Sequence, residues 1–433
     1  MKRIALIGAG TSGLFAAALL TERGFGVTVF DRLNRPGGRA PTIDREGFLL
    51  DAGPHLLRDA GNGQIAQTLA GLGLDVELYS VEYPEMLFLE NGKFHDFPAG
   101  VNRIADCDFL AESEKHSIFS LFTDIERSIQ DNMDRSLQEW VTHVNGGQGL
   151  LKFCHLASIG TVCTDLDRSS AGELIDLIWQ KRKRGTDGPA YPAGGYGVIH
   201  TLLAEYIQSN GGQLRLGSQV QKIEVKSGNS FGIVSESISE EFDAVVCALP
   251  ADKVPGLIEQ GSMESSYRQR LDKIRPTSGV SIEFALSEPV TDARQFMVCA
   301  QDPFIFGMAP SNLWPGCAPK NRQLLTFGAL SDRETVQKPD SCEFLFHSIR
   351  EKANEMLPGL ERKLLWERPL AFPVLDGVEL TVDQNRKLRP TPRDTGIDGL
   401  YLSGDFLCAV GSGGDLAVAS ALECVKAIEE DLG

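Results

Sequence analysis

The chain has few features of a protein that acts through metals or disulfides. Its nine cysteines are scattered, and no two stand in a CxxC pair or another metal-type spacing. The seven histidines are spread thinly, with no pair at helical spacing. This pattern predicts reduced thiols and no metal site.

Positive charge is also scarce. The 42 Lys and Arg residues face 59 Asp and Glu residues, which gives a formal net charge of −17. Nucleic-acid binding and broad adhesion to anionic lipid both depend on Lys and Arg, so we expect neither partner. One dense basic run, Lys181–Arg184, is interpreted as the solvated end of a helix, with a membrane-docking or anion-guiding patch beside Trp179 as the alternative.

Long hydrophobic runs are missing as well. No stretch approaches the roughly 20 apolar residues of a membrane-spanning helix, and the opening "MKRIALIGAG" is typical of a core strand rather than a signal peptide. We therefore expect a soluble, cytoplasmic protein. Its 433 residues are too many for one small core, so two domains are expected.

The first motif is rich in glycine. An apolar strand at Ile4–Ile7 leads into a G-x-G-x-x-G sequence formed by Gly8, Gly10 and Gly13. A helical segment and a second apolar strand follow, and Asp31 lies 18 residues beyond the third glycine, close to the spacing of about 20 in dinucleotide-binding βαβ units. Gly8 would permit a tight turn, Gly10 a close approach to a diphosphate, and Gly13 close packing of the helix on the strand. Asp31 would accept hydrogen bonds from the ribose hydroxyls.

A second glycine pair follows in "RPGGRA", residues 35–40. Gly37 and Gly38 would let the backbone approach the diphosphate, and Arg39 would supply a cation with fork geometry. The segment "FLLDAGPHLL", residues 48–57, then places a Gly-Pro turn before a lone histidine, His55.

The run from Gly8 to Gly53 resembles the FAD-binding start of the amine oxidase, protoporphyrinogen oxidase and phytoene desaturase superfamily. Segments around 190–255 and 385–433 resemble later parts of the same superfamily, including the strand Leu400–Leu402 and the pair Gly404-Asp405. The resemblance implies an α/β fold, with a discontinuous Rossmann-type FAD-binding domain of residues 1–80, 190–255 and 385–433. A second α+β substrate domain, residues 81–189 and 256–384, would contain a mixed sheet and helices.

The resemblance also implies which residues contact FAD. Val220 would lie under the adenine, Asp405 would bind the ribityl chain, and the last helix would aim its N-terminus at the pyrimidine side of the ring. The implied FAD-binding residues are Gly8, Gly10, Thr11, Ser12, Gly13, Asp31, Arg32, Gly37, Gly38, Arg39, Gly53, Pro54, His55, Val220, Ala248, Gly404, Asp405, Gly413, Gly414, Asp415 and Leu416.

His55 is the candidate catalytic residue. An imidazole near neutral pKa would accept a proton or orient a substrate, and a hydrogen-bonded structural histidine is the alternative. Many flavin amine oxidases carry a lysine before a Glu-Pro pair like Glu288-Pro289, whereas this sequence has Ser287 there. That departure favours desaturase-like or protoporphyrinogen-oxidase-like members. Tyr191, Tyr196 and Phe372 are candidate cavity walls, with plain core packing as the alternative.

These observations predict an FAD-dependent oxidoreductase that moves a hydride from a carbon of a small or apolar metabolite to the flavin, forming a C=C or C=N bond. No second G-x-G-x-x-G exists for NADPH, so electrons would leave to oxygen, a quinone or another acceptor. Two alternatives stay open. One is a non-redox flavoprotein isomerase or mutase. The other is a flavinless binding protein resembling Rab GDP-dissociation inhibitors, against which the Gly37–Arg39 loop and Gly404-Asp405 count.

Overall fold

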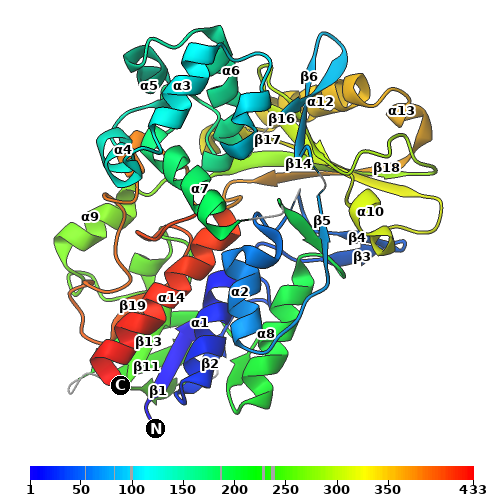
Figure 1. The fold of residues 1–433 in the computed structure, drawn as a ribbon. Coiled ribbons are helices and arrows are strands. Elements are labelled where there is room, and N and C mark those ends of the chain that lie inside the picture. The colour runs from blue at the N-terminus through cyan, green and yellow to red at the C-terminus, as the bar shows by residue number, and fades with distance from the viewer. Residues whose placement is uncertain (54, 82, 98–100, 186–187, 227–229, 236–238) are drawn as a thin grey trace.

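The structure is a computed structural model that describes residues 1–53, 55–81, 83–97, 101–185, 188–226, 230–235 and 239–433. Two large sheets with helices packed on them make up the molecule, and the N- and C-termini lie close together at one end (Figure 1).

Five parallel strands form the sheet beside the termini. In sheet order they are β9 (Gln213–Arg215), β2 (Gly26–Phe30), β1 (Arg3–Ile7), β13 (Ala244–Cys247) and β19 (Leu400–Leu402). The apolar part of the central strand β1 is buried, as a parallel strand covered on both faces requires. Strands from the beginning, the middle and the end of the chain thus share one Rossmann-like sheet, which confirms the predicted α/β class.

Helices cover one face of this sheet, and a smaller antiparallel sheet lies on the other. The helices are α1 (Thr11–Glu22), α2 (Gln64–Gly71), α8 (Gly197–Ser209) and α14 (Gly413–Leu432). The small sheet contains β10 (Val220–Lys226), β11 (Ser230–Ser235) and β12 (Ser239–Phe242), with α9 (Ser265–Lys273) packed nearby. Ser12 to Thr21 of α1 are all buried, because this helix packs against both α8 and α14 as well as the sheet.

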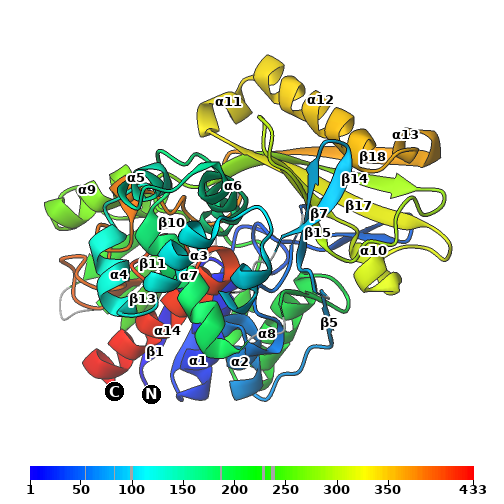
Figure 2. The same cartoon turned by 45° about the horizontal axis from the view of Figure 1, so that its top comes forward.

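The second large sheet is mixed, as predicted. Its order is β18 (Leu364–Phe372), β14 (Ser278–Leu286), β17 (Gln323–Ser331), β16 (Ile305–Met308), β15 (Phe296–Cys299), β6 (Met86–Glu90) and β7 (Lys93–Phe97). The β15–β6 pair is parallel, and the other pairs are antiparallel. Three helices cover one face of this sheet (Figure 2): α11 (Arg333–Gln337), α12 (Pro339–Met356) and α13 (Leu360–Lys363).

A layer of helices packs beside this sheet and above the parallel one (Figure 1). It contains α3 (Glu112–Ser120), α4 (Ile125–Asn132), α5 (Leu137–His143), α6 (Gln148–Ala157) and α7 (Ala171–Arg184). The remaining strands and helix are β3 (Ile43–Arg45), β4 (Phe48–Leu50), β5 (Leu78–Ser80), β8 (Ala190–Pro192) and α10 (Pro310–Leu313). The strands β5 and β8 pair antiparallel.

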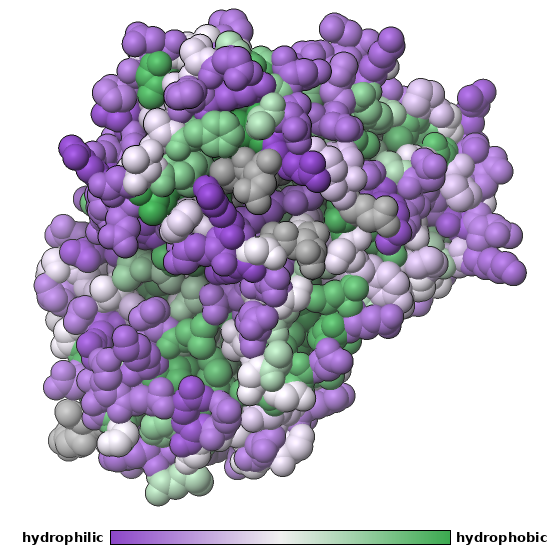
Figure 3. Space-filling view, viewed as in Figure 1, coloured by the Kyte–Doolittle hydropathy of each residue, from purple (hydrophilic) through white to green (hydrophobic). Residues whose placement is uncertain are grey.

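The basic run at the end of α7 is divided: Arg182 and Lys183 are exposed, as expected for a solvated helix end, whereas Lys181 and Arg184 form ion pairs. Lys181 pairs with Glu85, and Arg184 Nη1 lies 2.7 Å from Asp59 Oδ2. The guanidinium of Arg182 lies over the rings of Phe122 and Trp179. Hydrophilic residues cover most of the face in Figure 3, with apolar residues showing between them. Among the described residues, no helix has both the length and the apolar character needed to cross a bilayer.

Candidate functional site

A cavity of about 830 Å³ connects the two large sheets. This volume lies toward the upper end of the roughly 300–1,000 Å³ typical of cofactor and ligand pockets. Eighteen of the residues predicted to bind the cofactor line it. They are Gly8, Gly10, Thr11, Ser12, Asp31, Arg32, Gly37, Gly38, Arg39, Gly53, His55, Val220, Ala248, Gly404, Asp405, Gly413, Gly414 and Asp415.

Three predicted residues are not among those that line the cavity. Gly13 packs inside the first turn of α1, where an added Cβ would stand 1.9 Å from the carbonyl oxygen of Gly8. Leu416 is fully buried in the core beside the parallel sheet. Pro54 lies outside the described residues.

The glycine turn after β1 opens the start of α1 toward the cavity. Gly8 has a φ of +110°, and a Cβ there would lie 2.7 Å from the carbonyl oxygen of Ala248. At Gly10, by contrast, a Cβ would meet nothing within 4 Å. Helix α1 has no side-chain cap, and Gly10, Thr11 and Ser12 at its start line the cavity. The amides of an uncapped first turn are suited to an anion.

Asp31 holds this turn in place. Its Oδ2 accepts a 2.7 Å hydrogen bond from the backbone N–H of Ala9, and its Oδ1 accepts one of 2.7 Å from Leu33. The side chain lies at the end of β2 and lines the cavity beside Arg32 and Val220.

The second glycine loop lies directly against the first. The N–H of Gly37 donates to the carbonyl oxygen of Ala9 at 2.8 Å, and a Cβ on Gly38 would lie 3.1 Å from Cα of Gly10. Arg39 extends from this loop, and its Nη2 lies 2.5 Å from Oδ2 of Asp405, a residue 366 positions later. The two predicted anchors of the cofactor, from opposite ends of the chain, therefore meet.

His200, which the sequence did not predict as a site residue, contacts both glycine segments, through Thr11 in the first and Gly37 in the second. Its Nε2 shares a 2.9 Å hydrogen bond with Oγ1 of Thr11, and its Nδ1 is buried without a hydrogen-bond partner among the described residues. Burial, with His55 and Arg35 nearby, lowers the pKa of His200 to about 4. The imidazole is therefore neutral at physiological pH.

The start of α14 forms another wall of the cavity. Its N-cap, Ser412, provides no side-chain cap, and the Ser412 hydroxyl is buried without a partner among the described residues. Burial and the neighbouring Asp59 raise the pKa of Asp415 to about 6. Arg184 at the end of α7 approaches both carboxylates, with Nη1 2.7 Å from Asp59 Oδ2 and 3.9 Å from Asp415 Oδ2.

The turn that carries His55 is held by buried carboxylates. Asp51 accepts hydrogen bonds from the hydroxyl of Tyr191 at 2.5 Å, from the backbone N–H of Tyr196 at 3.0 Å, and from the Thr42 hydroxyl. Burial raises the pKa of Asp51. Tyr191 therefore braces this turn and is not among the cavity walls, whereas Tyr196 does line the cavity.

A second carboxylate reaches this turn from the mixed sheet. Glu283 on β14 is 1% exposed, accepts a 3.0 Å hydrogen bond from the backbone N–H of Ala52, and pairs with Arg368 on β18. The sequence signal for this contact is the glutamate inside the apolar run "GVSIEFAL". A glutamate buried in a strand requires a buried partner.

Two polar atoms near Gly53 belong to residues that line the cavity and are buried without hydrogen-bond partners among the described residues. They are Nε2 of His55 and Oγ of Ser281, which lie 4.0 and 3.9 Å from the position of a Cβ on Gly53. The ring of His55 lies beside that of Tyr196, with centroids 5.2 Å apart. Because buried polar groups normally have partners, these atoms indicate a bound molecule or solvent at this point.

Beyond this turn the cavity wall becomes apolar. The apolar side chains come from α6, α7 and the segment between them, and from strands of the mixed sheet. They include Phe97, Phe153, Leu156, Ile159, Leu174, Leu177, Ile178, Phe296 and Phe306.

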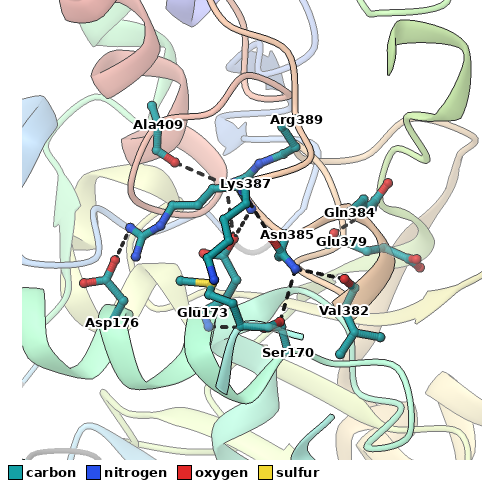
Figure 4. Close-up of polar contacts among 12 residues, drawn as sticks. Ser170, Glu173, Asp176, Glu379, Val382, Gln384, Asn385, Lys387, Arg389 and Ala409 are labelled. Carbon is teal, nitrogen blue, oxygen red and sulfur yellow. Dashed lines mark hydrogen bonds and ion pairs between the residues drawn. The ribbon is translucent and has the colours of Figure 1, made fainter. Parts of the chain in front are cut away.

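A buried ion-pair network fixes α7, whose other face forms part of that wall (Figure 4). Arg389 is fully buried; its Nη2 lies 3.3 Å from Oε1 of Glu173 and donates to the carbonyl oxygen of Ala409 at 3.2 Å. Arg386 pairs with Asp176 one turn further along α7. The wall of the apolar cavity is thereby tied to the segment between β18 and α14.

The residues of the cavity fit an elongated dinucleotide. Two uncapped helix starts, α1 and α14, open onto it, and each would favour negative charge. Gly10 leaves open space beside the first of them. Unpartnered polar atoms lie further along the same cavity.

Comparison with known proteins gives consistent results. The model of the family "flavin containing amine oxidoreductase" matches residues 11–428. The phytoene desaturase (lycopene-forming) of Pseudescherichia vulneris is 25% identical, with the alignment covering 100% of both chains.

Two solved structures show how widely this fold is used. A crystal structure of an oxidoreductase from Methanosarcina mazei has a TM-score of 0.78 at 23% identity, covering 99% of this chain and 100% of that one. The Rab GDI of Plasmodium falciparum has a TM-score of 0.62 at 14% identity, covering 99% and 98%. The fold alone therefore does not separate enzymes from binding proteins.

Proposed function

The chain belongs to the flavin-containing amine oxidoreductase family, a family of FAD-dependent oxidoreductases, and on that premise we propose that it oxidises a carbon of an apolar small molecule. The product carries a new C=C or C=N bond. The observation that supports this proposal most is the continuity of the cavity, which runs from the glycine turns at Gly8–Gly10 and Gly37–Gly38 to a wall of Phe and Leu side chains. Relatives named as phytoene desaturases also favour an apolar substrate.

In this proposal the FAD-binding unit comprises residues 1–80, 190–255 and 385–433, and residues 81–189 and 256–384 bind the substrate. Gly10, the start of α1 and Arg39 would bind the diphosphate, and Asp31 would bind the ribose. Val220 would contact the adenine, and Asp405 would bind the ribityl chain. The start of α14 stabilises negative charge at the ring. When bound, FAD would supply the hydride acceptor, and oxygen or a quinone would be the final acceptor of the electrons.

The chain's own residues bind and orient the substrate and exclude water from it. The apolar wall built by α6, α7 and the mixed sheet desolvates the substrate. His55 lines the cavity and would hold or accept a proton at Nε2, which is buried without a hydrogen-bond partner among the described residues. The carboxylates of Asp51 and Glu283 keep its turn in position.

The experiment combines spectroscopy with product mass. We expect the purified protein to bind FAD and to absorb in the blue, and a detergent-dispersed apolar isoprenoid, tried with and without a terminal carboxylate, to bleach that absorbance without oxygen. The product should be two hydrogens lighter than the substrate. An unchanged mass would instead indicate an isomerase, and failure to bind FAD would indicate a carrier like Rab GDI.

His55 is tested separately. In the FAD-loaded protein, His55→Gln should lower kcat by about 10²-fold, the lower end of what general acid–base groups contribute, while the thermal midpoint is retained. His347→Gln on the exposed face of α12 is the matched control, since the His347 side chain is 63% exposed. Equal kcat values in the two variants would remove His55 from the mechanism.

A further inference from the structure

Most of the cationic side chains that line the cavity form ion pairs with other described residues, but Arg58 does not. Arg39, Lys181, Arg184 and Lys253 line the cavity, and each forms an ion pair with a carboxylate. Arg58 also lines it and has no hydrogen bond or ion pair within the part of the chain that the structure describes. Arg32 shares this property but lies beside Asp31 at the nucleotide end.

Arg58 lies at the end of the cavity that contains His55, the residue proposed to hold or accept a proton. It follows His55 by three residues, and its neighbour Leu57 is fixed by a backbone bridge to Ala190. The ends of α7 and α14 meet here, through Arg184 and Asp415 (Figure 1). The side chain is half-buried, so its charge is only partly hydrated.

The carboxylates around Arg58 do not neutralise it by direct contact. Asp376 and Asp415 both lie within electrostatic reach of the guanidinium, yet neither forms an ion pair with it. Burial raises the pKa of both carboxyl groups, that of Asp415 to about 6. Asp59 and Asp415 already share Arg184, and Asp405 pairs with Arg39.

A partly desolvated guanidinium without a partner is suited to an anionic ligand. Its planar fork of N–H donors matches the two oxygens of a carboxylate, and such bidentate contacts are stronger than neutral hydrogen bonds. We propose that the substrate is amphipathic: an apolar body occupies the Phe- and Leu-lined part of the cavity, and a carboxylate at one end binds Arg58. This inference rests on the proposed function, because it takes the same cavity as the substrate site.

The proposal separates this chain from enzymes that take pure hydrocarbons. A hydrocarbon would offer the Arg58 guanidinium no hydrogen-bond acceptor and would displace water from it, at a cost in binding free energy. A carboxylate would be positioned by Arg58, so that its apolar chain extends past His55 toward Phe153 and Leu174.

The test uses ligands that differ in one end group only. FAD-loaded protein is titrated at pH 7.5 with decanoate, 1-decanol and decylamine, and binding is followed by calorimetry and by the change in flavin absorbance. We expect decanoate to bind at least about tenfold more tightly than 1-decanol, and decylamine to bind weakest. Equal affinities for decanoate and 1-decanol in the wild-type protein would overturn the proposal.

Variants then assign the effect to Arg58. Arg58→Gln should abolish the preference for decanoate, and Arg58→Lys, which keeps the charge but not the fork, should retain part of it. Arg127→Gln on the surface of α4 makes the same change in charge at a side chain that is 76% exposed, and it should bind like the wild type. A preference that survives Arg58→Gln would refute the role of Arg58.

FAD loading keeps the two proposals distinguishable. It is measured first for every variant, together with the thermal midpoint. If the wild-type protein does not bind FAD, the proposed function fails. If it binds FAD but Arg58→Gln does not, Arg58 belongs to the cofactor site and this inference alone fails.

Discussion

Two glycines of the same turn have different physical roles. Gly8 needs its positive φ and has a carbonyl oxygen against it, whereas Gly10 has an ordinary φ of −81° and open space where a side chain would project. The requirement for glycine at position 8 thus comes from the fold, and the requirement at position 10 comes from the ligand.

Alanine substitutions separate these roles. Gly10→Ala should leave the thermal midpoint of the FAD-free protein nearly unchanged and weaken FAD binding at least about tenfold, because the methyl group occupies the approach to the diphosphate. Gly8→Ala should destabilise the FAD-free protein by about 2 kcal/mol or more, since it adds left-handed strain to a close contact. Differential scanning fluorimetry and FAD titration measure both effects. A Gly10→Ala protein that binds FAD like the wild type would contradict the assignment.

At the scale of elements, helix α7 forms part of the cavity wall and carries two buried carboxylates, Glu173 and Asp176. Glu173 and Arg389 are 2% and 0% exposed at their side chains and lie 216 residues apart in sequence. A buried ion pair of this kind fixes how two segments meet rather than adding much net stability.

Breaking the pair from one side should therefore be costly. Arg389→Met leaves the Glu173 carboxylate buried without its cation and should lower the free energy of unfolding by about 3–5 kcal/mol. Adding Glu173→Gln should recover part of this loss, because the amide still accepts from the N–H of Arg386 without a buried charge. Chemical denaturation measures all three proteins. A double variant that is no more stable than Arg389→Met would show that the charge is not the cause.

The elements themselves were more predictable than their contacts. The strand at Leu400–Leu402 and the turn at Gly8–Gly13 follow from local patterns, since apolar runs and glycines determine short segments directly. The partners of Glu173 and Glu283 were missed, because the arginines that pair with them lie on distant segments and leave no local pattern. Arg58 was missed because a sequence cannot show that a charged side chain lacks a partner. That becomes visible only when its three-dimensional surroundings are known.

For the molecule as a whole, two buried groups give opposite pH dependences of stability. The pKa of Asp415 is raised from 3.8 to about 6, so between about pH 4 and 6 the native state holds a proton that the unfolded chain has lost, and stability falls as pH rises. The pKa of His200 is lowered from 6.5 to about 4, so in nearly the same window the unfolded chain takes up a proton and stability falls as pH falls. Each effect amounts to about 3 kcal/mol, and in the wild-type protein they largely cancel.

Single variants should reveal the separate pH effects of Asp415 and His200 on stability. FAD-free Asp415→Asn should lose stability relative to the wild type as pH falls from 6.5 to 4, because only the His200 effect remains. His200→Gln should gain stability relative to the wild type over the same range. Urea unfolding at four or five pH values measures both slopes. Parallel curves for Asp415→Asn and the wild type would show that Asp415 does not hold its proton more tightly in the native state.

The order of strands in the parallel sheet has a consequence for synthesis in the cell. Its central strand β1 is made first, but the edge strand β19 and the helix α14, which closes the cavity, are made only when the ribosome reaches Leu400–Leu402 and Gly413–Leu432. Until then the apolar surfaces of β1 and α1 lack their final cover, which leaves the growing polypeptide prone to aggregation. Loading of the flavin is therefore confined to the moments after translation is nearly complete.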